Sequence, residues 1–189
     1  MRLILASASP RRAQVLRDAG IAFEAVATRV DESRRENELP LDFVRRLAEA
    51  KARAAAERTS IAAIVVGADT EVVVDGLVLG KPASADDAHA MLRRLSSRTH
   101  EVLTGLAIVR LPDGAARTEH EITRVTFAPL TEEEIADYIA SGEPFDKAGA
   151  YAIQGRGGRY VTHVEGCYFN VVGLPLARLY HPAGIRLAR

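Results

Sequence analysis

Residues 61–82, IAAIVVGADTEVVVDGLVLGKP, supply three of the strands from which we build the predicted fold. The stretch opens with an apolar run that has the length and composition of a buried strand. Two further apolar runs, 71–74 and 77–79, flank Asp75-Gly76, a pair that favours the two-residue turn of a β-hairpin. We interpret Gly67-Ala68-Asp69-Thr70, between the first and second runs, as the loop that ends the buried strand.

Outward from this stretch, predicted strands and helices alternate along the chain, which indicates an α/β protein. Ser9 followed by Pro10 is typical of a helix start, and Thr131 followed by acidic residues has the pattern of a capping box. No linker is long enough to separate independent domains, so we predict one domain over residues 1–189. The expected order is a strand at 2–6, a helix from Pro10, a strand at 21–27, a helix at 41–58, the strand and hairpin just described, a helix from Ser84, strands at 102–111 and 115–128, a helix from Thr131, and a last helix within 170–179.

Composition and charge restrict the class of protein. The 25 Lys and Arg residues balance 25 Asp and Glu residues, and a net charge of zero argues against bulk electrostatic binding of nucleic acid. No apolar run approaches the roughly 18 residues of a membrane span, and the apolar stretch at 3–6 is far shorter than the roughly 7–15 residues of a secretory signal. We therefore expect a cytoplasmic protein with no membrane partner. Its single cysteine, Cys167, excludes an internal disulfide, and we expect a buried or half-buried thiol.

The segment Ser7-Ala8-Ser9-Pro10-Arg11-Arg12 combines two hydroxyls with two guanidiniums at a predicted helix start. A helix N-terminus has free backbone N–H groups and a partial positive charge, so it suits an anion such as a polyphosphate. Arginine can also bind phosphate through two hydrogen bonds. The alternative is more common: a serine cap followed by a solvated pair of arginines.

Acidic residues follow two of the predicted strands. Asp69 comes directly after the strand that begins at residue 61, where open α/β sheets bind their ligands, so its carboxylate could hold a metal or activate water. A turn-forming aspartate is an equally good interpretation of that residue. Asp31 and Glu32 lie in the polar loop after residue 27 and are interpreted as solvated charge unless something pairs them with Asp69.

Lysine is rare in this chain, because only Lys51, Lys81 and Lys147 stand among its 25 basic residues. An ammonium is a compact point charge, so a lysine kept among arginines suggests a place where the planar guanidinium does not fit. Chance is an equally good explanation for any one of the three, and an ordinary surface lysine is the better interpretation of Lys51 by itself. Lys147 and Gln154 share a glycine-bracketed loop, and the Gln154 amide offers the donor and acceptor needed to recognise a base edge. The run at 155–158, Gly-Arg-Gly-Gly, fails the dinucleotide-binding fingerprint and is interpreted as ordinary turn chemistry.

Taken together, these motifs resemble those of the Maf family of nucleoside triphosphate pyrophosphatases. The resemblance implies a Maf/ITPase-like α/β fold, in which a mixed twisted sheet with flanking helices forms two lobes around a deep cleft. It also implies hydrolysis of a nucleoside triphosphate to the monophosphate and pyrophosphate with a divalent metal, Mg or Mn. GADT and DKAGAYAIQG resemble the subgroup that acts on dTTP and UTP. The matching segments are LASASPRR (5–12), VDE (30–32), Lys51, GADT (67–70), GKP (80–82), GEPFDKAGAYAIQG (142–155) and NVVGLPL (170–176).

The resemblance also implies a role for each matching position. Asp69 matches the catalytic acid, and together with Glu32 it offers oxygen ligands to the metal. Lys147 is a further residue of the implied site. The positions implied to contact phosphate are Ser7, Ser9, Arg11, Arg12, Lys51 and Lys81, and those implied to select the base are Arg12, Thr70 and Gln154.

Two other functions stay open from the sequence. One is a related house-cleaning pyrophosphatase that prefers non-standard purine triphosphates such as dITP or XTP. The other is a nucleotide-binding regulator of cell division without meaningful turnover. The sequence leaves the oligomeric state open as well, with a homodimer as one alternative to a monomer.

Overall fold

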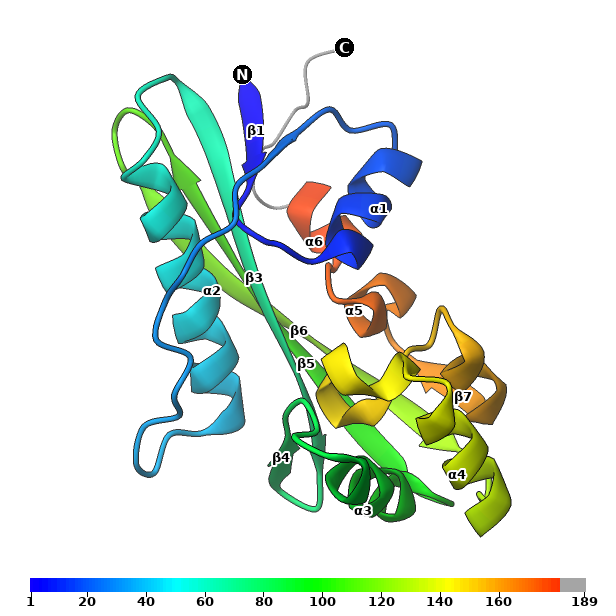
Figure 1. The fold of residues 1–189 in the computed structure, drawn as a ribbon. Coiled ribbons are helices and arrows are strands. Elements are labelled where there is room, and N and C mark those ends of the chain that lie inside the picture. The colour runs from blue at the N-terminus through cyan, green and yellow to red at the C-terminus, as the bar shows by residue number, and fades with distance from the viewer. Residues whose placement is uncertain (181–189) are drawn as a thin grey trace. The chain divides into compact units, whose positions relative to one another are not determined.

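The structure, a computed structural model, describes residues 1–180 and confirms the expected alternation of strands and helices (Figure 1). None of the helices within that range is long and apolar enough to cross a membrane. Three short 3₁₀ helices occupy 143–146, 148–150 and 156–160. The other elements are β1 (Arg2–Leu5), α1 (Pro10–Asp18), β2 (Glu24–Ala25), α2 (Pro40–Ala56), β3 (Ala63–Val74), β4 (Leu77–Leu79), α3 (Ala85–Leu95), β5 (Thr99–Arg110), β6 (Ala116–Phe127), α4 (Glu132–Ala140), β7 (Val161–Glu165), α5 (Tyr168–Val172) and α6 (Leu176–Tyr180).

The strands of the described chain form one mixed sheet, in agreement with the expected fold class. Its order is β2-β1-β3-β5-β6-β7, with β4 paired to β3. β1 runs parallel to both β2 and β3, whereas β3–β4 and β6–β7 are antiparallel pairs. The β3–β4 turn is the predicted one, because Asp75 and Gly76 have φ angles of 51° and 77°, as a hairpin turn of this length requires.

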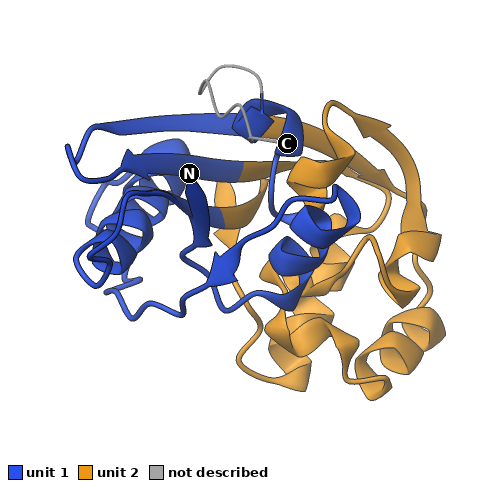
Figure 2. Cartoon of the chain, turned by 90° about the horizontal axis from the view of Figure 1, so that it is seen from above, with its two compact units in different colours: residues 1–69, 104–121, 173–189 blue, residues 70–103, 122–172 orange. Residues whose placement is uncertain are grey.

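The chain divides into two compact units, each with its own core (Figure 2). Unit 1 consists of residues 1–69, 104–121 and the described residues from 173 onward, and unit 2 consists of residues 70–103 and 122–172. β3, β5 and β6 each contribute residues to both units, so neither unit is a separate run of chain. Asp69 is the last residue of the first segment of unit 1, and Thr70 begins unit 2.

In unit 1, α2 packs directly on two strands because each strand has a glycine beneath the helix. A Cβ atom on Gly67 of β3 would lie 2.2 Å from the Ala48 carbonyl oxygen, and one on Gly105 of β5 would lie 2.2 Å from that of Val44. The facing side of α2 includes three fully buried alanines, Ala48, Ala52 and Ala55. Backbone-to-backbone packing of this kind leaves no room for a side chain at Gly67.

The interpretation of residues 67–70 as a loop is wrong. β3 continues without a break from Ala63 to Val74, so Asp69 lies inside a long strand and not after its end. The glycine at 67 is there because α2 approaches closely, and not because the chain turns. The strand predicted at 21–27 is likewise reduced to the exposed pair Glu24–Ala25, and β7 was not predicted.

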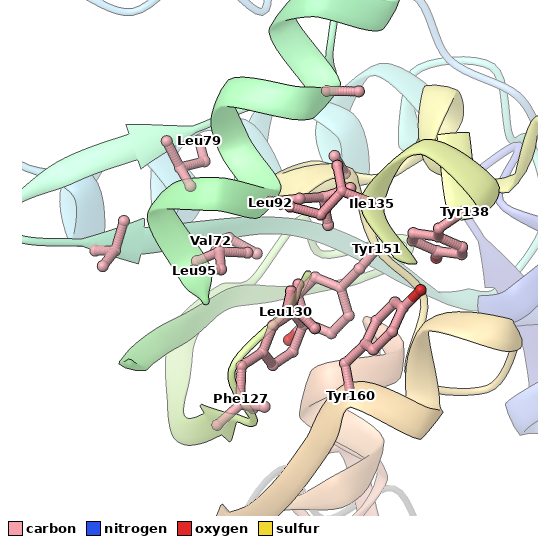
Figure 3. Close-up of a cluster of buried hydrophobic side chains, with 14 of the residues drawn as sticks. Val72, Leu79, Leu92, Leu95, Phe127, Leu130, Ile135, Tyr138, Tyr151 and Tyr160 are labelled. Carbon is pink, nitrogen blue, oxygen red and sulfur yellow. The ribbon is translucent and has the colours of Figure 1, made fainter. Parts of the chain in front are cut away.

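The core of unit 2 is built on the hairpin, α3, α4 and a group of aromatic rings (Figure 3). Phe127 and Tyr151 meet edge to face with their ring centroids 4.8 Å apart, and Tyr138 and Tyr160 meet in the same way at 5.5 Å. Edge-to-face contacts are the preferred arrangement of aromatic pairs and help to fix the rings in place. Cys167 of this unit is half-buried, as predicted.

Candidate active site

The residues predicted to bind phosphate at the chain start form a connected group in unit 1. Ser9 caps α1 as predicted, since its Oγ accepts the backbone N–H of Arg12 at 3.4 Å. Ser7 is buried, and its Oγ accepts the backbone N–H of Ser9 at 3.1 Å and Nη1 of Arg12 at 3.2 Å. Nε of Arg12 donates to the Gly173 carbonyl at 2.7 Å. The guanidinium of Arg12 is therefore held in one orientation and is not a freely solvated charge. Arg11 lies beside it in the first turn of α1 and is half-buried.

Asp69, Lys51 and Glu32 form a second group in unit 1. Nζ of Lys51 lies 2.6 Å from Oδ1 of Asp69 and 2.7 Å from Oε1 of Glu32. The side chains of Lys51 and Asp69 are only 12% and 10% exposed, whereas that of Glu32 is 57% exposed. Of the two acids interpreted as solvated charge unless paired with Asp69, Glu32 is thus joined to Asp69 by a lysine, whereas Oδ1 of Asp31 accepts the backbone N–H of Ser33 at 2.9 Å.

The close packing of α2 on β3 explains how Lys51 reaches Asp69. Side chains alternate between the two faces of a strand, so Gly67 and Asp69 share the face that α2 covers. Ala48 of α2 lies over Gly67, and Lys51 follows Ala48 at the i+3 spacing that places two side chains on one side of a helix. Its ammonium therefore lies beside the carboxylate of Asp69.

One oxygen of Asp69 is unsatisfied. Oδ2 is buried, and within residues 1–180 it has no hydrogen-bond partner, while Oδ1 is held by Lys51. A buried acceptor without a partner costs about 1–3 kcal/mol, and such an atom in a cluster of charged groups is typical of a site that binds something. The three side chains carry formal charges of −1, +1 and −1, so the group retains one negative charge.

This donor set fits a hard divalent cation. Carboxylate oxygens are the ligands that Mg²⁺ and Mn²⁺ prefer, and the unsatisfied Oδ2 of Asp69 offers one. No group of three or more His, Cys, Asp or Glu side chains in the described chain could hold a metal by itself. Mg²⁺ is usually bound through one or two carboxylates, with phosphate and water completing its shell.

Of the predicted site residues of unit 2, Thr70 lies in β3, whereas Lys81, Lys147 and Gln154 lie on two loops joined by a backbone hydrogen bond. Lys81 is exposed in the loop after β4, and the carbonyl of Gly80 accepts the N–H of Gly149 at 3.0 Å. Gly149 belongs to the glycine-bracketed loop that also contains Lys147 and the exposed Gln154. Nζ of Lys147 donates to Oδ1 of Asp146, with a lysine side chain only 13% exposed. That the sets in the two units act on one nucleotide stays a prediction from the sequence.

Sequence analysis missed the residues that hold the acidic loop of unit 1. Nε and Nη2 of Arg46 donate to the two carboxylate oxygens of Glu38 at 2.6 and 2.8 Å, and Nη2 also donates to the Ser33 carbonyl at 3.0 Å. This pairing lowers the pKa of Glu38 to about 2, chiefly through the hydrogen bond from Arg46. The contact joins α2 to the segment that contains Glu32. No local spacing rule could have found it, because Glu38 lies in a loop and Arg46 in a helix.

Comparison with known proteins identifies the family. Residues 2–182 match the family model described as "Maf-like protein". The chain is 53% identical over 177 residues to the dTTP/UTP pyrophosphatase of Symbiobacterium thermophilum, covering 94% of this chain and 90% of that protein. It is 52% identical to the dTTP/UTP pyrophosphatase of Koribacter versatilis (95% and 92% covered) and 48% identical to that of Carboxydothermus hydrogenoformans (95% and 96% covered). The chain therefore belongs to the Maf-like protein family.

Proposed function

We propose that this chain hydrolyses dTTP and UTP to the monophosphate and pyrophosphate by attack of water at the α-phosphorus. Relatives that match 94–95% of the chain at about 50% identity have the name dTTP/UTP pyrophosphatase. The observation that carries the proposal is the ion cluster of Asp69, Lys51 and Glu32, with its one buried, unsatisfied carboxylate oxygen. Such an oxygen is suited to taking a proton or binding a metal, and its side chain is already fixed.

We assign the reactive role in this cluster to Oδ2 of Asp69. Lys51 holds Oδ1 at 2.6 Å, so the carboxylate cannot turn freely and presents its other oxygen. This oxygen accepts the proton of the attacking water or ligates the metal. Lys51 also places its positive charge directly beside this carboxylate.

We further propose that Glu32 and Asp69 hold a divalent cation, Mg or Mn, when nucleotide is bound. The cation would supply Lewis-acid polarisation of a phosphoryl oxygen and charge for the departing pyrophosphate. Glu32 is the more exposed carboxylate, at 57%, and Lys51 tethers it to the cluster at 2.7 Å. The side chain of Glu32 thus contributes an oxygen that can meet a metal–nucleotide complex arriving from solvent.

The basic and hydroxyl groups predicted to contact phosphate are assigned to the triphosphate. Phosphoryl transfer depends mainly on positioning and on stabilising the charge of the leaving group, which fixed cations do well. In unit 1 the proposed phosphate ligands are Ser7, Ser9, Arg11, Arg12 and Lys51, and in unit 2 the ligand is Lys81, with Lys147 as a further site residue. Base selection is assigned to Arg12, Thr70 and Gln154, and the enzyme is proposed to act in the cytoplasm.

The proposal is tested by measuring pyrophosphate release from a panel of nucleotides with Mg²⁺ or Mn²⁺. We expect dTTP and UTP to be the best substrates and Asp69→Asn to lower kcat by about 10²–10⁴-fold, the usual contribution of a general base. The melting temperature of the variant should stay close to that of the wild type. Preference for dITP or XTP would favour the purine alternative, and nucleotide binding without product would favour a regulator. Near-normal turnover by Asp69→Asn would disprove its role.

A further inference from the structure

The backbone around Gln154 in unit 2 is held on both sides by one pair of side chains, Tyr138 and Glu143. The hydroxyl of Tyr138 accepts the backbone N–H of Ala152 at 3.1 Å and donates to Oε1 of Glu143 at 2.7 Å. The Glu143 carboxylate in turn accepts the backbone N–H of Arg156 at 3.0 Å, through Oε2. Ala152 precedes Gln154 and Arg156 follows it, so a single chain of hydrogen bonds spans the segment.

The pair is rigid because it is rooted in the core of unit 2. Tyr138 comes from α4, is fully buried, and its ring packs edge to face on Tyr160 (Figure 3). Burial raises the pKa of the Tyr138 hydroxyl, so the group remains a donor. Burial also acts to raise the pKa of Glu143, but the hydrogen bonds from Tyr138, Arg156 and Gly157 outweigh it and the pKa is lowered. Hydrogen bonds to an ionised carboxylate are the strong kind.

The glycines that follow Gln154 are explained by this pair. A Cβ atom on Gly155 would lie 2.4 Å from Oε1 of Glu143, and one on Gly157 would lie 2.6 Å from the Tyr138 hydroxyl. Gly157 also donates its N–H to Oε1 of Glu143 at 3.2 Å. These glycines let the backbone approach the Tyr138 hydroxyl and the Glu143 carboxylate, so the Gly-Arg-Gly-Gly run interpreted from the sequence as turn chemistry serves a specific contact.

We propose that Tyr138 and Glu143 are positioning residues for base selection. They hold the segment from Ala152 to Gly157 in one conformation, so the amide of Gln154 meets the base at a fixed place. Gln154 itself is exposed, so core packing does not hold its side chain. The place from which its amide can meet the base is therefore set by the backbone on either side. This inference rests on the proposed function, in which Gln154 selects a pyrimidine base.

The test measures selectivity, which a purely structural role would leave unchanged. The readout is the ratio of kcat/KM for UTP to that for CTP in wild type, Tyr138→Phe and the matched control Tyr160→Phe. The Tyr160 hydroxyl donates to the Glu134 carbonyl at 3.0 Å and accepts Nη2 of Arg159 at 2.6 Å, and within residues 1–180 neither bond involves the 152–157 backbone. Tyr138→Phe removes the hydroxyl's bonds to Ala152 and Glu143. We expect it to lower the ratio about tenfold and Tyr160→Phe to leave the ratio unchanged.

A double-mutant cycle separates positioning from a general loss of stability. In a Gln154→Ala background, Tyr138→Phe should lower the ratio no further, because the side chain that it positions is gone. The proposal is overturned if Tyr138→Phe lowers the UTP-to-CTP ratio equally in the wild-type and Gln154→Ala backgrounds. It is also overturned if either Tyr138→Phe alone or Gln154→Ala alone leaves that ratio unchanged. If Tyr138→Phe does not fold, Glu143→Gln replaces it in the cycle and is held to the same outcomes.

The same assay separates the two proposals. A wild-type protein that releases no pyrophosphate from UTP disproves the proposed function. A wild-type protein that prefers UTP, with an equally selective Tyr138→Phe variant, disproves only the positioning role.

Discussion

Lowering the pH from 7 to 5 should destabilise the protein through one buried histidine, His100. This residue of β5 is 1% exposed, and its Nε2 lies 2.8 Å from the Tyr151 hydroxyl. Its ring meets those of Phe127 and Tyr151 edge to face, with centroids 5.1 and 5.4 Å away. Within the described chain its buried Nδ1 has no hydrogen-bond partner. Burial is the cause of the shift, and it lowers the pKa of His100 to about 4.

The sign and size of the effect follow from linkage. The folded pKa, about 4, is below the ordinary value of 6.5, so between these pH values the unfolded chain binds more protons than the folded one. The contribution of neutral His100 to the free energy of unfolding is therefore fully present above about pH 6.5 and is lost as the pH falls toward 4. For these two pKa values, the loss is about 2 kcal/mol between pH 7 and 5 and about 3 kcal/mol by pH 4.

The measurement is urea unfolding of wild type and His100→Gln at pH 7, 6 and 5. Glutamine does not titrate and can still form a hydrogen bond with Tyr151, so it removes the proton-binding site while keeping a polar partner. Carboxylates elsewhere titrate alike in both proteins and cancel in the comparison. We expect the wild type to lose about 2 kcal/mol more than the variant from pH 7 to 5. Parallel losses in the two proteins would refute the reasoning.

Three further predictions concern the site and its supports. Gly67→Ala should cost about 1–3 kcal/mol of stability, measured by urea unfolding, because its Cβ would meet the Ala48 carbonyl; Gly80→Ala, whose Cβ would meet nothing within 4 Å, is the matched control and should cost far less. Lys81→Arg should lower kcat/KM for UTP by about tenfold, because a planar guanidinium replaces a compact ammonium. A wild-type kcat/KM would contradict the proposed phosphate role of Lys81. Arg46→Gln should raise the Mg²⁺ or Mn²⁺ concentration needed for half-maximal turnover, because it removes the hydrogen bonds from Arg46 that hold the loop containing Glu32. An unchanged metal dependence would show that metal binding does not require these hydrogen bonds.

Local sequence chemistry predicted the parts of this fold that depend on nearby residues. The Ser9 cap of α1, the turn at Asp75-Gly76 and the capping box at Thr131 are all confirmed. Each depends on hydrogen bonds or φ angles within a few residues, so a single sequence contains all the information that they require.

The predictions from the sequence were wrong where the identity of a residue depends on a contact with a segment far away in the chain. Gly67 and Asp69 are residues that commonly form turns, and their local pattern indicated a loop. The actual reason for Gly67 is the backbone of α2 at Ala48, which no local rule connects to β3. The contacts of Tyr138 and Glu143 were missed for the same reason, because they are made to backbone N–H groups, which any residue other than proline can supply.

The placement of Asp69 inside β3 strengthens the case for its role. A carboxylate on a loop can turn toward water, and its pairing with a lysine would cost side-chain entropy. In β3 the backbone is fixed by neighbouring strands, the glycine at 67 brings α2 against the same face, and Lys51 arrives beside Oδ1 as a consequence of that packing. The unsatisfied Oδ2 is thus held in place by the core of unit 1 and not by the ligand that it is proposed to meet, which is the preorganisation that charge stabilisation in catalysis requires.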